Sequence, residues 1–335
     1  MPAALAEIIR NEMVESVHYG HLVLLNAKGE IQLAIGDINL PIFPRSCVKP
    51  LQARAMVKAG LKLEPKLLAL VTASHSGSET HIDIVHQILK SAGLDESALQ
   101  CALDKPLGEV ERKQWGDAAP TRIAMNCSGK HAGMLAACIT NNWPIENYLA
   151  MDHPLQKLIL EEIESASGEK SVNKTFDGCG APLFAISTLG LARAIQNVTV
   201  GSDSASTQIR NAMREFPELV SGVGRLTQRW MSVIPGLLMK EGAEGVQIAS
   251  LSDGRTLAFK ISDGGFRPFS VITAAALAQF GVKAPDESVS VFGGGAPVGT
   301  IRATFCNFNS WISTCDPKCN CWCRFGFDSD SQCNA

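Results

Sequence analysis

The chain is organised around the stretch Pro44-Arg45-Ser46-Cys47-Val48-Lys49-Pro50, which opens the run from Leu51 to Gly60. A serine stands three residues before a lysine at the predicted start of a helix, where Pro50 is tolerated in the first turn. That spacing places both side chains on one face. A serine hydroxyl becomes nucleophilic when a base takes its proton, and an uncharged amine one helical turn away can do so. Because Ser-x-x-Lys also occurs by chance about once in a few hundred residues, the pair alone does not assign catalysis.

Length and composition exclude several classes of protein. The chain has 335 residues, of which 46% are hydrophobic, and a formal net charge of −3. It can therefore bury one large core or two closely packed lobes, and its dispersed charges form no basic patch for nucleic acid. Residues 1–17 carry glutamates, and no later run approaches the ~20 apolar residues of a membrane span. We expect a soluble, cytoplasmic protein that binds neither nucleic acid nor a membrane.

The cysteines divide the chain into two parts. Five are spread over residues 1–305, whereas six crowd residues 306–335. Sparse cysteines fit a reducing compartment, where they serve in packing, metal binding or catalysis. We predict a single domain over 1–305 and a Cys-rich tail over 306–335 that is disordered and reflects a frame-shifted or otherwise aberrant terminus.

The apolar pattern predicts hairpins and helices in alternation. Strands are expected at 17–25, 31–37, 242–250, 256–262, 289–292 and 298–305. Helices are expected at 51–60, 64–72, 79–92, 134–139, 155–165, 182–195, 208–216 and 269–280. Ser78 is the expected N-cap of the helix at 79–92. Residues 101–121 show little periodicity and are interpreted as a long surface excursion.

Two further features follow the Ser-x-x-Lys pair. The loop 73–78, Ala-Ser-His-Ser-Gly-Ser, is dense in hydroxyls, and Lys260 lies on a predicted strand, on the face opposite Leu257 and Phe259. Serine acyl-transfer enzymes of the penicillin-recognising type place a serine and lysine pair, a second hydroxyl and a strand lysine in this order. Taken separately, Ser76 would be a helix-start cap and Lys260 a solvated strand residue.

A second cluster contains Cys127, Lys130, His131 and Cys179. Two thiolates and a nitrogen donor could hold zinc in a four-coordinate site. Cys-x-x-Lys is not a usual zinc pairing, and a lysine must lose its proton to bind metal. The alternative is a pair of buried structural cysteines.

Several of these motifs resemble one known family. They are the stretches 46–52, 73–77, 126–135, 177–180, 240–245 and 260–264, which together resemble the asparaginase II family, the Rhizobium-type L-asparaginases. The resemblance spans roughly residues 14–305. It implies a serine β-lactamase or penicillin-binding-protein-like fold of the α/β (α+β) class, with a mostly antiparallel sheet and flanking helices. It further implies a homodimeric enzyme that hydrolyses L-asparagine to L-aspartate and ammonia.

The resemblance also implies catalytic roles. Ser46 would be the nucleophile with Lys49 as its base. Ser76 and Lys260 would form a second hydroxyl and amine couple. Ser74 is the alternative to Ser76, because in an extended loop the two serines share a direction.

The remaining site residues concern metal and substrate. The resemblance implies a Zn²⁺ site at Cys127, Lys130 and Cys179, where the metal helps to bind substrate and does not generate the nucleophile. The candidates for substrate binding are His131, Asp177 and Arg45.

Two departures from the family keep other readings open. Cys47 stands where the family usually has a serine, and the tail 306–335 has no counterpart. A β-lactamase-like or other serine-lysine amidohydrolase or peptidase would share the same serine and lysine plan. The cysteine-rich tail would also suit a catalytically silent binding or zinc-storage protein.

Overall fold

A twisted antiparallel sheet forms one side of the molecule. The computed structural model describes residues 1–285 and 287–305, and within them eight strands form the main sheet in the order β11-β12-β1-β2-β10-β9-β8, with β3 also paired to β2. The strands are β1 (Ala3–Arg10), β2 (Met13–Leu25), β3 (Ile31–Ile35), β8 (Leu238–Gly242), β9 (Val246–Ser250), β10 (Thr256–Ile261), β11 (Ser290–Gly293) and β12 (Ala296–Ala303).

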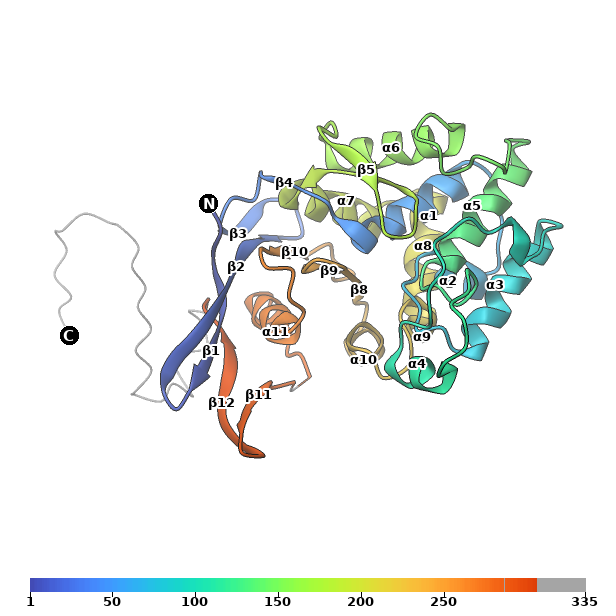
Figure 1. The fold of residues 1–335 in the computed structure, drawn as a ribbon. Coiled ribbons are helices and arrows are strands. Elements are labelled where there is room, and N and C mark those ends of the chain that lie inside the picture. The colour runs from blue at the N-terminus through green and yellow to red at the C-terminus, as the bar shows by residue number, and fades with distance from the viewer. Residues whose placement is uncertain (286, 306–335) are drawn as a thin grey trace.

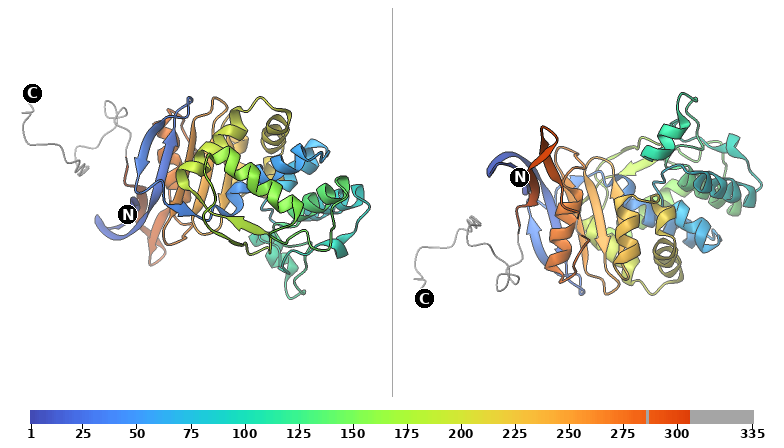
Figure 2. Two further views of the ribbon diagram at one scale, coloured as in Figure 1. Left: turned by 90° about the horizontal axis from the view of Figure 1, so that it is seen from above. Right: turned by 90° about the horizontal axis from the view of Figure 1, so that it is seen from below.

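The middle of this sheet is covered on both faces. Helix α7 (Thr188–Val200) and helix α11 (Phe269–Gln279) lie on opposite sides of the strands (Figures 1 and 2). All five residues of β9 are buried, as expected for a strand with apolar layers on both sides. At the far end, the hairpin β1–β2 and the hairpin β11–β12 extend beyond the helices (Figure 1).

The remaining helices gather beside the β8 edge of the sheet (Figure 1). They are α1 (Lys49–Lys58), α2 (Pro65–Val71), α3 (Glu79–Ser91), α4 (Glu109–Trp115), α5 (Ser128–Thr140), α6 (Pro154–Ser167), α8 (Ser204–Glu215), α9 (Pro217–Val220) and α10 (Leu226–Val233). Helix α1 runs through their middle and is buried from Lys49 to Met56, so it has no solvent face over that length.

Short elements lie between the longer helices and strands. They are the 3₁₀ turns η1 (Arg45–Val48) and η2 (Glu96–Ala98), the pair β4 (Pro41–Ile42) and β7 (Ile186–Ser187), and the pair β5 (Lys174–Phe176) and β6 (Pro182–Phe184). The buried residues of the sheet and of the helices form one hydrophobic cluster. The turn η1 and the start of α1 lie where the two parts meet.

The predicted mixed α/β class, with an antiparallel sheet and flanking helices, is confirmed. Ser78 caps α3 as expected, because its side chain accepts a hydrogen bond from the backbone N–H of His81. Two predictions were wrong. Residues 101–121 contain the helix α4, and the helix expected at 182–195 begins only at Thr188, since residues 182–184 pair with 174–176 as strands. Strands β1 and β8 were not predicted.

The predictions for the tail 306–335 fall outside the described residues. In the described ranges, 1–285 and 287–305, none of the helices combines the length and the apolar character needed to cross a membrane.

Candidate active site

The turn that carries Ser46 has an unusual backbone. Arg45 has a φ of 51°, in the left-handed region that residues other than glycine seldom adopt. Its side chain is held from two directions, by Asp177 Oδ1 at 2.8 Å from Nε and by Glu244 Oε1 at 3.8 Å from Nη1. Ser46 follows it, half-buried, as the second residue of η1. The ion pairs therefore help to fix the turn from which the proposed nucleophile projects.

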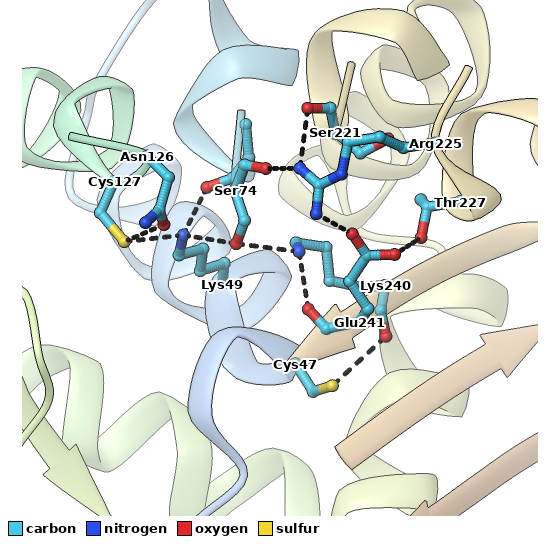
Figure 3. A network of polar contacts seen from close by, with 11 residues as sticks. Cys47, Lys49, Ser74, Asn126, Cys127, Ser221, Arg225, Thr227, Lys240 and Glu241 are labelled. Atoms are coloured by element: carbon cyan, nitrogen blue, oxygen red, sulfur yellow. Dashed lines mark hydrogen bonds and ion pairs between the residues drawn. The ribbon is translucent and has the colours of Figure 1, made fainter. Parts of the chain in front are cut away.

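Lys49 points from the start of α1 into the protein, where it is 1% exposed. Its Nζ donates hydrogen bonds to Ala73 O at 2.5 Å, to Ser74 Oγ at 2.9 Å and to Cys127 Sγ at 3.1 Å (Figure 3). Ser46 is not among these partners. The serine in contact with Lys49 is Ser74, which follows α2, and the pairing of Lys49 with Ser46 stays a prediction.

Lys240 approaches the same hydroxyl from the sheet. It lies on β8, and its Nζ is 3.0 Å from Ser74 Oγ and 2.8 Å from Glu241 O (Figure 3). Burial lowers the pKa of Lys240 to about 7, an effect that Lys49 and Arg225 increase and that Glu241 and Cys47 oppose. Ser74 Oγ thus lies between two buried amines, one of which can lose its proton near neutral pH.

The structure does not bring Ser76 and Lys260 to this point. Ser76 Oγ donates to Glu111 Oε1 at 2.8 Å, beside α4. Lys260 lies on β10 opposite His21, its amine donates to Ile261 O, and its charged neighbours are Glu244 and Asp263. The strand lysine that contacts a serine of the loop 73–78 is Lys240, which the sequence marked only as part of the motif 240–245.

Cys47 faces away from the site. Its thiol donates to Lys240 O at 3.3 Å and to Val246 O at 3.5 Å, behind the sheet edge. Burial raises the pKa of Cys47 to about 12, so this thiol is not a nucleophile at neutral pH. The departure from the family at this position leaves Ser46 as the residue on the accessible side of the turn.

Gly242 lets β8 lie directly on the turn that carries Ser46. A Cβ atom at Gly242 would be 3.1 Å from Cys47 Sγ and from Pro44 O, and 3.3 Å from Ser46 N. Such contacts are tighter than ordinary van der Waals contacts, so a larger residue would push the strand and the turn apart. Gly242 therefore allows the turn that carries Ser46 to lie against β8, two residues after Lys240 on that strand.

The cysteine cluster lies next to the serine and lysine cluster. Lys130 Nζ, on α5, donates to Cys179 Sγ at 3.1 Å, and Cys127 and Cys179 share a hydrogen bond. That bond, together with Lys130 and His131, holds the pKa of Cys179 well below its ordinary range, against the effect of burial. The pKa of Cys127 is raised by the same bond and by burial. The two cysteines are therefore electrostatically coupled, and their surroundings favour negative charge on Cys179 over Cys127.

These three residues fit the donor chemistry of zinc. Two sulfur atoms and one nitrogen atom converge from α5 and from the loop at Cys179, and all three residues are almost fully buried. Burial would lower the pKa of Lys130, but the neighbouring Cys179, Cys127 and Asp177 outweigh it and raise that pKa, so a metal would have to displace a proton. Within the described part of the chain, His, Cys, Asp and Glu side chains form no group of three or more that could hold a metal ion.

The candidate substrate-binding residues are placed in two different ways. Arg45 and Asp177 pair with each other at the rim of the site. His131 is fully buried, with Nδ1 2.8 Å from the hydroxyl of Tyr148 and its ring hydrogen-bonded to the Cys179 side chain. Arg45 and Asp177 therefore border the site, and His131 belongs to the cysteine cluster through its contact with Cys179.

Solved structures similar to this chain include three of low sequence identity. A β-lactamase from Mycobacterium bovis is 16% identical, with 78% of this chain and 95% of that chain covered and a TM-score of 0.45. EstCE1, described as a hydrolase with promiscuous acyltransferase activity, is 10% identical, with 82% and 93% covered and a TM-score of 0.39. Mglu, crystallised in the presence of 4.3 M NaCl, is 12% identical, with 80% and 62% covered and a TM-score of 0.37.

Comparison with protein families gives a direct assignment. No curated protein matches the chain. The sequence pattern of the L-asparaginase II family, however, matches residues 6–297, a range that contains the complete serine and lysine cluster and the cysteine cluster. The resemblance that the motifs indicated is thereby confirmed, and the chain belongs to the L-asparaginase II family of amidohydrolases.

Proposed function

We propose that this protein hydrolyses L-asparagine to L-aspartate and ammonia through an ester of Ser46. The observation that carries the proposal is the position of Ser74 Oγ, 2.9 Å from Lys49 Nζ and 3.0 Å from Lys240 Nζ, beside the turn that bears Ser46. Membership of the L-asparaginase II family supports the choice of a small amide as substrate. A serine, a base and a proton relay are the parts that acyl transfer requires.

The proton of Ser46 can leave along this chain of groups. A neutral Lys240 accepts the proton of Ser74, and Ser74 Oγ then accepts one from Lys49. Lys49 is left with a free electron pair to take the proton of Ser46 as its oxygen attacks the side-chain amide carbon of asparagine. Because burial lowers the pKa of Lys240 to about 7, this lysine can be neutral, and so accept the Ser74 proton, at neutral pH.

The return of that proton completes the reaction. Attack on the amide gives a tetrahedral oxyanion, which backbone N–H groups at the start of the helix, including that of Ser46, stabilise; removal of one such donor typically costs about a hundredfold or more in rate. Ser74 delivers a proton to the departing ammonia. Water then attacks the β-aspartyl ester, and the same amines take and return its proton.

The cysteine cluster has a supporting role in this proposal. Cys127, Lys130 and Cys179 would hold Zn²⁺, which supplies a positive charge that binds the polar substrate. The side chains of the cluster also act directly on the site, because Cys127 Sγ accepts a hydrogen bond from Lys49 Nζ at 3.1 Å and so orients the base. Arg45 and Asp177, at the rim, are the proposed contacts for the charged groups of the amino acid.

The proposal is tested by release of ammonia from asparagine, glutamine and a β-lactam, measured side by side. We expect turnover of asparagine that is lost in Ser46→Ala. Activity of Ser46→Ala close to that of the parent protein would remove the nucleophile from the proposal. Stable acylation of Ser46 by a labelled β-lactam, without turnover of asparagine, would assign the protein to β-lactam-type hydrolases or peptidases instead.

A further inference from the structure

Arg225 lies behind the two residues that form the proton relay. Its Nη1 donates to Ser74 O at 2.6 Å and to Ser221 O at 3.1 Å, and its Nη2 pairs with the carboxylate of Glu241 (Figure 3). Arg225 immediately precedes α10, whereas Ser74 follows α2 and Glu241 belongs to β8. One guanidinium group therefore connects a loop of the helical part to a strand of the sheet.

Glu241 is fixed at its other end as well. Its second carboxylate oxygen accepts a hydrogen bond of 2.6 Å from Thr227 Oγ1, and its side chain is only 12% exposed. Burial would raise the pKa of Glu241, but Arg225, Lys240 and the Thr227 hydrogen bond outweigh it and hold that pKa below its usual range. Glu241 is thus a charged carboxylate with defined partners, and Arg225 is its main counter-ion.

The two backbones that Arg225 connects carry the reactive groups. Ser74 presents its hydroxyl from the residue whose carbonyl Arg225 binds, and Lys240 is the residue before Glu241 and donates to the Glu241 carbonyl at 2.8 Å. A planar guanidinium group binds two acceptors in fixed directions, so it sets a distance between them. We infer that Arg225 and Glu241 are positioning residues, which hold the Ser74 hydroxyl at hydrogen-bond distance from the Lys240 amine.

The effect of these residues on turnover rests on the proposed function. The charges around Lys240 also predict how the pH dependence of kcat/KM changes when one of them is removed. Lys240 faces Glu241, Lys49, Cys47 and Arg225. Loss of the Arg225 charge should move the acid limb of kcat/KM to higher pH, because Arg225 disfavours a proton on Lys240. Loss of the Glu241 charge should move that limb to lower pH. A general loss of structure would not shift the acid limb to higher pH in the Arg225 variant and to lower pH in the Glu241 variant.

Four variants test the inference in the full-length protein. Arg225→Gln and Glu241→Gln each remove one charge. Arg225→Lys keeps the charge, but an ammonium group lacks the fork that reaches both partners. Thr227→Val removes only the hydrogen bond that orients Glu241. The matched control is Arg229→Lys. Arg229 lies one helical turn after Arg225, its side chain is 47% exposed, and its ion-pair partner is Glu287, at 2.6 Å, which is not one of the relay residues.

We expect kcat for asparagine to fall by about 10- to 100-fold in Arg225→Lys and Glu241→Gln with little change in KM, since misplacement by about 1 Å costs on this scale. Thr227→Val should show a smaller fall, and Arg229→Lys should match the parent. If Arg225→Gln does not fold, Arg225→Lys and Thr227→Val decide the question.

Two results would overturn the inference: parental kcat in Arg225→Lys, or acid limbs that move together in Arg225→Gln and Glu241→Gln. Ser46→Ala, assayed in parallel, separates this failure from failure of the proposed function. An inactive Ser46→Ala beside an active Arg225→Lys contradicts only the positioning role. An active Ser46→Ala contradicts the reaction itself.

Discussion

The hydroxyl of Ser74 lies 3.0 Å from the amine of Lys240, although 166 residues separate them in the chain. This contact joins the helical part of the molecule to the edge strand β8. It is the reason why we assign the proposed proton relay to Ser74, where the sequence had named Ser76 with Ser74 as the alternative.

The first prediction concerns these two serines. Ser74→Ala should lower kcat for asparagine by about a hundredfold or more, because the amines then have no hydroxyl between them. Ser76→Ala loses only its hydrogen bond to Glu111, a loss worth about 1 kcal/mol of unfolding free energy, and should keep turnover near that of the parent. Ammonia release and thermal unfolding of both variants check this. The opposite ranking would return the role to Ser76.

The second prediction concerns pH. Lys240 must be neutral to accept the Ser74 proton, and burial lowers its pKa to about 7. Protonation therefore inactivates the relay below that pH, and kcat/KM for asparagine should rise as pH increases through about 7. A series of initial rates between about pH 5 and pH 9 measures the limb. Lys240→Arg, which is charged throughout this range, should be inactive at every pH, and a flat profile for the parent would contradict the role given to Lys240.

The third prediction concerns the contact between β8 and the turn of Ser46. Gly242→Ala would place a methyl group 3.1 Å from Cys47 Sγ and from Pro44 O. The turn must then shift away from the strand, so we expect kcat to fall by about tenfold or more. Adding Cys47→Ala should restore part of the lost rate, because it removes one of the two crowded atoms. Equal rates in the single and double variants would argue against crowding as the cause.

The fourth prediction concerns metal. Cys179→Ala removes one of the two sulfur donors of the cysteine cluster, so zinc content measured by elemental analysis should fall, and KM for asparagine should rise without loss of kcat. Cys138→Ala is the matched control, because Cys138 is an equally buried free cysteine on the same helix as Lys130. Freshly prepared parent protein without zinc, or equal zinc in both variants, would remove the metal from the proposed function.

Much of this arrangement could be predicted from local sequence. The start of α1 at Lys49, the cap at Ser78 and the hairpin of β9 and β10 depend on residues close together in the chain, and periodicity and turn chemistry detect them. The resemblance to the family could be stated because its motifs are long and occur in a fixed order. The sequence paired a second serine with a strand lysine at Ser76 and Lys260, whereas the structure has a contact of this kind between Ser74 and Lys240.

The assignment of the strand lysine could not be made in this way. Lys240 and Lys260 both lie on strands that lead into glycine-containing turns, and alternation along a strand does not distinguish them. The two lysines are distinguished only by the register of β8, β9 and β10. Lys240 lies opposite Ile248 on β9, whereas Lys260 lies opposite Val246, which in turn pairs with Gly242. Pairing between distant segments is invisible to a local pattern. The strand β6 is a different case, because it pairs with the nearby β5 and was mistaken for the start of the helix that follows it.

The ion pair between Arg45 and Asp177 has a consequence for how the nucleophile responds to its surroundings. The left-handed backbone at Arg45 costs on the order of 1 to 2 kcal/mol relative to a relaxed turn, and a partly exposed contact with a loop 132 residues away opposes its relaxation. Dissolved ions weaken such a contact more than they weaken an apolar core. We therefore expect the position of Ser46, the proposed nucleophile, to respond to the ionic strength of the medium through the arginine that precedes it.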